Sequence, residues 1–221
     1  MTKPRLHNVI CSTRPGRAGP AVAHWFNQPV SEQGKFEPVL VDLADFNLPV
    51  YDEPLHPIFR QYQHEHTKRW SASVASADAF VFVTPEYNYN PPPAFVNALD
   101  YVYHEWNYKP CGFVSYGGAS GGVRAVQVEK QLVTTLKMMP MVEGVAIPGI
   151  ADLLTEGRPL KVADTIAVAV MALLEELLKW TTALRALRER PSVASQSDLT
   201  AEHVRTPAAE IRADRTRAVI R

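Results

Sequence analysis

Aromatic rings, amides and a carboxylate are grouped between prolines in one short segment of the sequence. The segment directly follows an apolar run at residues 79–83 and reads Thr84-Pro85-Glu86-Tyr87-Asn88-Tyr89-Asn90-Pro91-Pro92-Pro93. Because prolines restrict the backbone, such a loop can present flat aromatic faces and fixed backbone amides to a planar ligand. This combination suits a flavin ring better than a sugar or a peptide.

A second segment, residues 11–20, has the composition of an anion site. It contains two hydroxyl donors, Ser12 and Thr13, and two guanidinium groups, Arg14 and Arg17, and a helical pattern follows it. Hydroxyls, guanidinium groups and the free N–H groups of a helix N-terminus all bind phosphate well. The sequence fits neither G-x-G-x-x-G nor G-x-x-x-x-G-K-[ST], which argues against a dinucleotide site or a nucleotide hydrolase. An ordinary solvated turn with two exposed arginines is the alternative.

A third segment, residues 116–122, is rich in glycine and reads Tyr116-Gly117-Gly118-Ala119-Ser120-Gly121-Gly122. Glycines let a ligand approach the main chain closely. The segment also fits G-x-S-x-G, the pattern of a serine hydrolase with Ser120 as nucleophile. Asp152 or Asp164 could supply the carboxylate of such an enzyme, but the only histidine after Ser120 is His203. The hydrolase therefore remains a minor alternative.

Short apolar runs alternate with helical patterns along the chain. The runs lie at residues 6–10, 39–43, 79–83, 111–116 and 141–147, and the helical patterns at 21–31, 59–76, 94–105, 123–137 and 160–187. This alternation predicts an α/β fold, a doubly wound parallel sheet of five strands covered by helices on both faces. Ligands of such sheets bind outside the carboxyl ends of the strands, and all three segments follow strands.

Length and composition predict one main domain at residues 1–190 and a C-terminal tail at 191–221, either disordered or an arm between subunits. The 23 basic and 23 acidic residues balance, so we expect neither a nucleic-acid nor a membrane partner. Two distant cysteines and no apolar run of membrane-spanning length favour a cytoplasmic protein. His64 and His66, which we place on different faces of a helix, do not predict a metal site.

Together the segments resemble the NADPH-dependent FMN reductases, a flavodoxin-like family that includes azo, quinone and chromate reductases. The resemblance covers about residues 6–187. It rests on Ser12-Thr13-Arg14-Pro15-Gly16-Arg17, on Thr84-Pro85-Glu86-Tyr87-Asn88, on Asn97-Ala98-Leu99-Asp100 and on Tyr116-Gly117-Gly118. It implies the strand order 2-1-3-4-5, bound FMN, and a homodimer or homotetramer.

The resemblance also implies the residues of the site. The FMN phosphate would contact Ser12, Arg14, Arg17 and Gly19; the flavin ring would lie against Pro85, Glu86, Tyr87, Asn88 and Tyr89 on one side and Tyr116, Gly117 and Gly118 on the other. NADPH, with NADH as an alternative donor, would reduce the flavin, which would pass the electrons to a small electrophilic acceptor: a quinone, an azo compound, a metal oxyanion or free flavin. The chemistry would lie on the flavin, with no catalytic side chain.

The sequence departs from the family pattern at three places. Cys11 stands where glycine is common, Tyr89-Asn90 replace a smaller pair, and Phe95-Val96 replace a frequent leucine-lysine pair. The larger Tyr89 would reshape the space above the ring, so the departures concern acceptor choice more than FMN binding. A flavodoxin-type electron carrier without turnover of its own remains an alternative, although its usual acidity is missing here.

Overall fold

A computed structural model of the protein describes residues 2–155 and 158–189. The expected tail at residues 191–221, and with it the boundary near residue 190, lies outside these ranges. His203, a residue that the hydrolase hypothesis needs, lies outside them as well.

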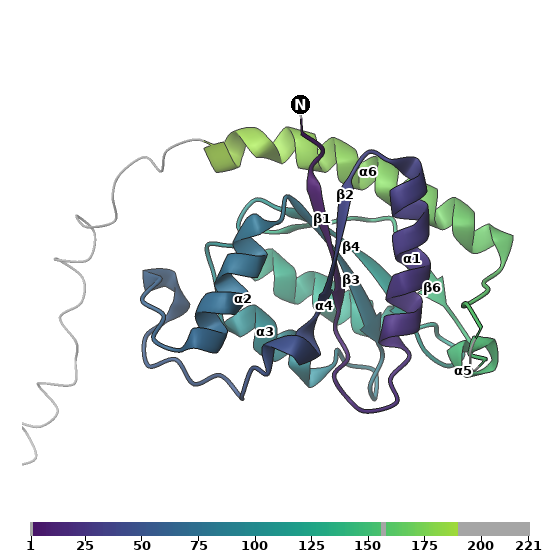
Figure 1. Ribbon diagram of the computed structural model, residues 1–221, viewed down its shortest axis with the longest axis horizontal. Coiled ribbons are helices and arrows are strands. Elements are labelled where there is room, and N and C mark those ends of the chain that lie inside the picture. Colours follow the sequence, from purple (N-terminus) through teal and green to yellow (C-terminus); the bar gives the residue numbers. More distant parts are fainter. Residues whose placement is uncertain (1, 156–157, 190–221) are drawn as a thin grey trace, which may run out of the picture. The chain divides into compact units, whose positions relative to one another are not determined.

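A parallel sheet forms the centre of the fold (Figure 1). Its strands are β1 (Arg5–Ile10), β2 (Glu37–Asp42), β3 (Ala79–Pro85), β4 (Pro110–Tyr116), β5 (Met139–Pro140) and β6 (Val145–Ile147). The order is β2-β1-β3-β4-β5, and β6 also pairs with β4. The predicted flavodoxin-like order 2-1-3-4-5 is confirmed.

Helices connect the strands and cover the sheet. They are α1 (Gly19–Gln33), α2 (Glu65–Ser76), α3 (Pro93–Asp100), α4 (Val123–Thr135), α5 (Ile150–Leu153) and α6 (Asp164–Glu189), with short 3-10 helices η1 (Leu43–Phe46) and η2 (Pro57–Phe59). Helix α1 has a proline in its first turn and is followed by Gly34, whose φ of 67° is the left-handed conformation that glycine adopts readily after the last helical residue.

Side chains on the central strands alternate between two hydrophobic cores. On β3, Val81 and Val83 face α1 and α6, whereas Phe80 and Phe82 face α2, α3 and α4. Figure 1 shows α1 on one side of the strands and α2 and α3 on the other. Every residue of β3 and β4 is buried, as expected for a parallel sheet covered on both faces.

Helix α6 packs closely on the sheet at one glycine. A Cβ atom built on Gly112 of β4 would lie 2.6 Å from Cδ1 of Leu173, which is too close for a real side chain. Leu173, Val170, Leu174 and Leu177 are all buried in the same core as α1. Leu173 thus occupies the space that a side chain at position 112 would need.

Several sequence predictions differ from the structure in their boundaries; the last helix, expected from residue 160, begins at Asp164. Of the fifth strand, expected at residues 141–147, only β6 (Val145–Ile147) is formed; the two-residue strand β5 lies just before the expected range, and the intervening segment contains Gly144. Because Pro140 has no backbone N–H, it cannot donate a hydrogen bond that would extend the pairing of β5 with β4. Helix α2 begins at Glu65 rather than at residue 59, after η2, and α3 ends at Asp100 rather than at residue 105. The short helix α5 was not predicted.

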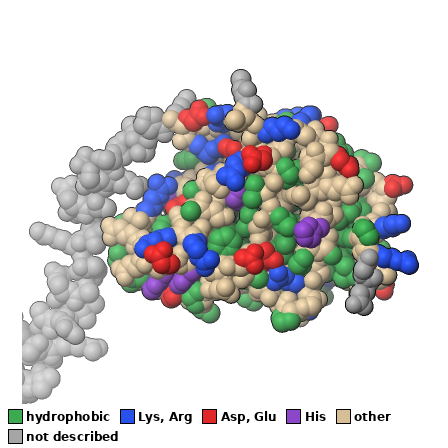
Figure 2. All heavy atoms as spheres, in the orientation of Figure 1, with side chains coloured by type: hydrophobic (Ala, Val, Ile, Leu, Met, Phe, Trp, Pro, Cys, Tyr) green, Lys and Arg blue, Asp and Glu red, His purple; other side chains and the backbone are tan. Residues whose placement is uncertain are grey.

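Charged groups of both signs are mixed on the molecular surface. Figure 2 shows lysine and arginine side chains beside aspartate and glutamate across the face drawn there. In the described part of the chain, no helix is long and apolar enough to cross a membrane.

Candidate functional site

The three loops identified in the sequence follow adjacent strands. Residues 11–18 follow β1, residues 86–92 follow β3 and residues 117–122 follow β4, and these strands are neighbours in the sheet. Because all strands are parallel, the loops emerge at the same edge. Strand order reverses between β1 and β3, the position at which doubly wound sheets bind ligands.

Ser12, Gly19 and Tyr116 form a buried contact beneath the first loop. The Tyr116 hydroxyl lies 3.1 Å from Oγ of Ser12, and Ser12 has no exposed surface. A Cβ atom on Gly19 would lie 2.4 Å from the same Oγ, so only glycine fits at this position. Burial raises the pKa of Tyr116, which keeps the phenol protonated as a donor. The predicted phosphate ligand Ser12 and the predicted ring neighbour Tyr116 therefore contact each other.

The two arginines of the first loop have different surroundings. Arg14 is exposed, and among the described residues its guanidinium makes one long hydrogen bond, 3.4 Å from Nη1 to the carbonyl oxygen of Pro15. Arg17 forms a salt bridge with Asp42 at the end of β2. Arg14 is therefore the better placed of the two to bind an anion, and Arg17 already has a carboxylate partner.

The N-terminus of α1 adds main-chain donors next to these arginines. No side chain in the described part of the chain caps it, and its first turn contains no acidic residue. Uncapped N–H groups and the helix dipole together favour a bound anion.

A tight turn shapes the second loop. The backbone groups of Tyr87 and Asn90 exchange two hydrogen bonds of 2.9 Å, and φ is 51° at Asn88 and 69° at Tyr89. Positive φ at both central positions is the geometry of a type I′ turn. The loop is fixed by this turn as well as by the prolines that the sequence indicated, and it leaves the Tyr89 ring 63% exposed.

Glu86 links the second loop to the third. Its carboxylate lies 3.1 Å from the Ser120 hydroxyl, 3.2 Å from the backbone N–H of Arg124 and 3.0 Å from Nε of Arg124. The carboxylate is therefore occupied by protein donors. Ser120 donates to Glu86, and the structure gives it no histidine partner within the described residues, so the nucleophile arrangement is not formed there.

Main-chain hydrogen bonds fix the third loop to the segment after β6. The carbonyl oxygens of Gly117 and Gly118 accept from the N–H groups of Ile150 and Gly149, each at 3.0 Å. A Cβ atom on Gly118 would meet nothing within 4 Å, so open space lies beside this glycine. The loop can accept a ligand against its backbone there.

One buried acid near these loops escaped the sequence analysis. Glu129 of α4 is completely buried, and its Oε1 lies 2.5 Å from the Thr84 hydroxyl at the end of β3. Burial raises the pKa of Glu129 to about 8, although the hydrogen bond from Thr84 opposes the shift. A signal was present in the sequence, because Glu129 shares a helix face with the buried Val126 and Val133.

Two polar atoms at the loops lack a partner among the described residues. They are the buried hydroxyl of Tyr87 and Nε of Arg17. Buried polar groups normally have partners, so such atoms are expected where a ligand completes a site. The donors at the loops, namely Arg14, the α1 N-terminus and the Tyr87 hydroxyl, fit an anionic and partly aromatic cofactor such as FMN.

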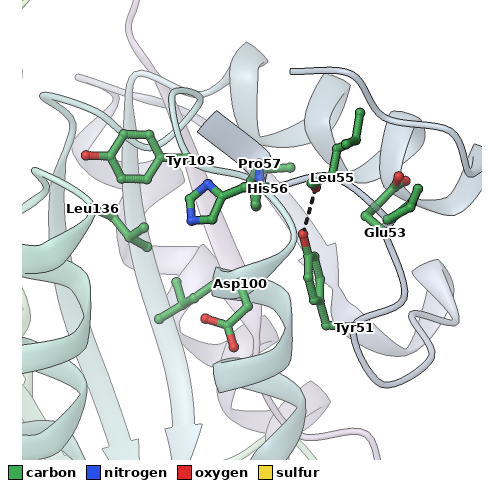
Figure 3. Close-up of a pocket in the computed structure, with 11 residues that line it drawn as sticks. Tyr51, Glu53, Leu55, His56, Pro57, Asp100, Tyr103 and Leu136 are labelled. Carbon is green, nitrogen blue, oxygen red and sulfur yellow. Dashed lines mark hydrogen bonds between the residues drawn. The ribbon is translucent and has the colours of Figure 1, made fainter. Parts of the chain in front are cut away.

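The cavities on the surface of the described chain include two that the segment after β2 helps to line. One of about 270 Å³ adjoins the first loop and is lined by Thr13, Leu43, Ala44, Asn47, Leu48 and Ala94. The other, of about 460 Å³, lies between the segment after β2 and the C-terminal part of α3 (Figure 3). None of the three loops lines the second cavity, so we do not assign it to the cofactor.

His64 and His66 differ from their predicted arrangement. His64 precedes α2 instead of lying within it, and the two rings stack with centroids 5.2 Å apart beside Asp52. The expectation that they point to different helix faces is wrong. Even so, no group of three or more His, Cys, Asp or Glu side chains in residues 2–155 and 158–189 is arranged to hold a metal ion.

Comparison with known proteins places the chain among flavin-dependent reductases. The sequence model of the NADPH-dependent FMN reductase family matches residues 4–152. An NAD(P)H-dependent FMN reductase of Schizosaccharomyces pombe is 44% identical over 137 residues, which cover 61% of this chain and 68% of that protein. A quinone reductase of Pseudomonas putida is 31% identical over 154 residues, covering 67% of this chain and 80% of that protein.

A solved structure shares the fold. The flavoenzyme NAD(P)H:(acceptor) oxidoreductase FerB of Paracoccus denitrificans superposes with a TM-score of 0.64 at 20% sequence identity. The match covers 81% of this chain and 98% of that one.

Proposed function

Because the chain belongs to the NADPH-dependent FMN reductase family, we propose that the three loops hold FMN and that the protein transfers electrons from NAD(P)H to a small acceptor. One observation carries the proposal. An exposed arginine, an uncapped helix N-terminus, an aromatic turn and an open glycine backbone lie on loops after three adjacent strands, β1, β3 and β4, and strand order reverses between the first two.

The first loop would bind the phosphate. Arg14 supplies a guanidinium group without a carboxylate partner in the described chain, and the α1 N-terminus supplies backbone donors. Arg17, in turn, would act mainly by holding the loop against Asp42. Gly19 lets α1 begin directly beside Ser12, and this brings the helix N-terminus close to the end of β1.

The second and third loops would hold the ring. The Tyr87 hydroxyl is free to bond a polar ring atom, and Pro85 is paired in register with Tyr116 on the adjacent strand. Gly117 and Gly118 would form the opposite border, with Gly118 leaving room for close approach. When bound, FMN would supply the redox chemistry by taking up two electrons from NAD(P)H and releasing them to the acceptor.

The protein's own contribution would be binding, orientation and exclusion of water. Glu86, the carboxylate of the proposed ring-binding loop, is already engaged, since it bonds Ser120 and Arg124. We therefore assign no side chain an acid or base role, in keeping with an electron transfer whose chemistry lies on the cofactor.

The preference for NADPH and the choice of acceptor are the finer parts of the proposal. Curated relatives include reductases that use NAD(P)H and quinone reductases, which supports a quinone as the first acceptor to test. An electron carrier is not favoured, because these relatives are enzymes. A serine hydrolase is not favoured either, because Ser120 bonds Glu86.

Spectroscopy on the purified protein tests the function directly. We expect flavin absorbance bands that bleach when NADPH is added without oxygen and return when a quinone is added. Steady NADPH consumption with quinone alone distinguishes an enzyme from a carrier, which would need a protein partner. A protein that takes up no FMN and consumes no NADPH would contradict the proposal.

We also propose a cytoplasmic homodimer. Two buried, unpaired cysteines, Cys11 and Cys111, suit a reducing compartment. Exposed apolar side chains gather near the larger cavity: Val50 is 88% exposed, Leu55 41% and Phe59 52%. Sedimentation velocity would test the assembly, and monomers at micromolar concentration would contradict it.

A further inference from the structure

Glu129 is a buried acid without a charged partner among the residues that the structure describes. Its side chain lies on the apolar face of α4, and no other described residue bonds its second oxygen, Oε2. An ionised carboxylate in such a place would lose its hydration without gaining a cation. The neutral acid is therefore the form that this environment favours.

The hydrogen-bond geometry around Thr84 also favours the neutral form of Glu129. Oγ1 of Thr84 lies 2.5 Å from Oε1 of Glu129 and 3.3 Å from the carbonyl oxygen of Pro85. A threonine hydroxyl has one hydrogen, so it can donate to only one of these oxygens. If Glu129 carries a proton, it donates to Oγ1 of Thr84, and the threonine hydrogen is free for Pro85. All three oxygens then have a partner.

We infer that Glu129, as the neutral acid, is a positioning residue of the cofactor site: through Thr84 it holds the Pro85 carbonyl, where the ring-binding loop begins. The inference rests on the proposed function in that it takes the loop after β3 as part of the FMN site. Glu129 does not itself contact the ligand space, since it is completely buried beneath Thr84.

The neighbouring titratable groups do not supply a counter-charge. From the end of β1 and from β4, Cys11 and Cys111 interact electrostatically with Glu129, and burial raises the pKa of both thiols. Asp42, at the end of β2, further raises the pKa of Cys11, and Lys130 of α4 lowers that of Cys111. Both thiols stay neutral near neutral pH, and the pKa of Glu129 itself is raised by burial and lowered by the hydrogen bond with Thr84.

Loss of the Glu129 proton would rearrange this chain of bonds. The Thr84 hydrogen would turn toward the carboxylate, and the Pro85 carbonyl would lose its donor. Because the pKa of Glu129 is raised to about 8, the change falls in an accessible range. FMN affinity is thus expected to fall as pH rises through that value.

The test is FMN binding by the apoprotein, measured by quenching of flavin fluorescence between about pH 6 and about pH 9. Wild-type affinity should fall about five- to tenfold over this range, which corresponds to the loss of one hydrogen bond. In Glu129→Gln the amide can still donate to Thr84 but cannot ionise, so affinity should stay near the wild-type low-pH value throughout. Glu129→Leu should bind about five- to tenfold more weakly at low pH.

Glu175→Gln on the exposed part of α6 is the matched control and should behave as wild type. Circular dichroism establishes that each variant is folded. If Glu129→Gln kept the wild-type pH dependence, or if Glu129→Leu bound FMN as tightly as wild type at low pH, the positioning role would be overturned.

An infrared measurement separates this inference from the proposed function. The apoprotein should show the C=O stretch of a protonated carboxyl group, absent in Glu129→Gln and lost as pH rises through about 8. No such band at neutral pH would refute the neutral acid, whatever FMN does. Conversely, a wild-type protein with this band that binds no FMN would refute the cofactor site and the positioning role with it.

Discussion

The guanidinium carbon of Arg124 lies 3.9 Å from the centroid of the Tyr89 ring, so a residue at the start of α4 covers the tip of the loop after β3. The same arginine pairs with Glu86 at 3.0 Å. One side chain therefore joins the loop after β3 to the start of α4, the helix into which the third loop leads.

Replacing Arg124 should loosen this connection. We expect Arg124→Ala to lower the free energy of unfolding by about 1–2 kcal/mol, from a partly exposed ion pair and a cation–π contact. Arg124→Lys keeps the charge but loses the planar stack, so its stability should lie between those of the wild type and Arg124→Ala. Urea denaturation measures both. Equal stability of all three proteins would contradict a joining role for Arg124.

The turn at Tyr89 stores backbone strain. An aromatic residue at a φ of 69° costs about 1 kcal/mol relative to glycine, and the Arg124 stack offsets a similar amount. Tyr89→Gly removes both effects and should change stability by less than about 1 kcal/mol. Tyr89→Ala keeps the strain but loses the stack, so it should be the less stable of the two. Thermal unfolding of the two variants measures this difference. A Tyr89→Ala variant more stable than Tyr89→Gly would contradict the backbone strain.

The two arginines of the first loop should have separable effects. Arg14→Ala is expected to weaken FMN binding by about 10- to 100-fold with little loss of stability, because it removes a charged donor to the phosphate. Arg17→Ala should mainly reduce stability, because Asp42 loses its partner. Lys3→Ala, before β1 at the opposite edge of the sheet, is the control. If folded Arg14→Ala kept full FMN affinity, the phosphate assignment would fail.

Gly19 should not tolerate a side chain. Its Cβ would lie 2.4 Å from Oγ of Ser12 and 2.8 Å from Cγ2 of Ile10. We expect Gly19→Ala to destabilise the protein by about 1–3 kcal/mol, as overpacking of a core does. Gly118→Ala meets open space and should leave stability unchanged, while weakening FMN binding if the ring approaches that backbone. Denaturation curves measure the difference. A Gly19→Ala variant as stable as the wild type would contradict the close contact.

Lys109 should make stability depend on pH. Burial, together with the charge of Arg188, lowers its pKa from 10.5 to about 7, while its Nζ bonds the carbonyl oxygens of Val74 and Ala75. Between these pKa values the unfolded chain binds the proton and the folded chain does not. The contribution of Lys109 is therefore full above pH 10.5 and is lost as pH falls toward 7.

Over that interval the stability of the wild type should rise by up to a few kcal/mol relative to Lys109→Met. Urea denaturation at several pH values measures the difference. Lys179→Met, an exposed lysine of α6, should show no such trend and serves as the control. Parallel pH curves for wild type and Lys109→Met would rule out the buried titration.

Local patterns in the sequence predicted the parallel sheet, because the buried strands are nearly continuous apolar runs. They also predicted that three loops would lie at one edge, because parallel strands end together. The two short strands in place of a single fifth strand were not predicted, since a run of apolar residues does not reveal which of them pair with β4.

Long-range partners were the other part that local patterns could not predict. Arg17 and Arg14 look alike in the sequence, and only the folded chain brings Asp42 to one of them. Likewise, Ser12 and Tyr116 are 104 positions apart, and their hydrogen bond depends on the order of the strands. Glu129 could have been found as a carboxylate on an apolar helix face, but its partner Thr84 could not.

The packing of Leu173 against Gly112 limits how far the chain can be truncated at its C-terminal side. The family pattern ends at residue 152, whereas α6 begins at Asp164 and fills the core on the α1 side with Val170, Leu173, Leu174 and Leu177. A chain ending at residue 152 would leave this half of the sheet open to water and prone to aggregate. The segment that identifies the family is therefore shorter than the segment that must be expressed for it to fold.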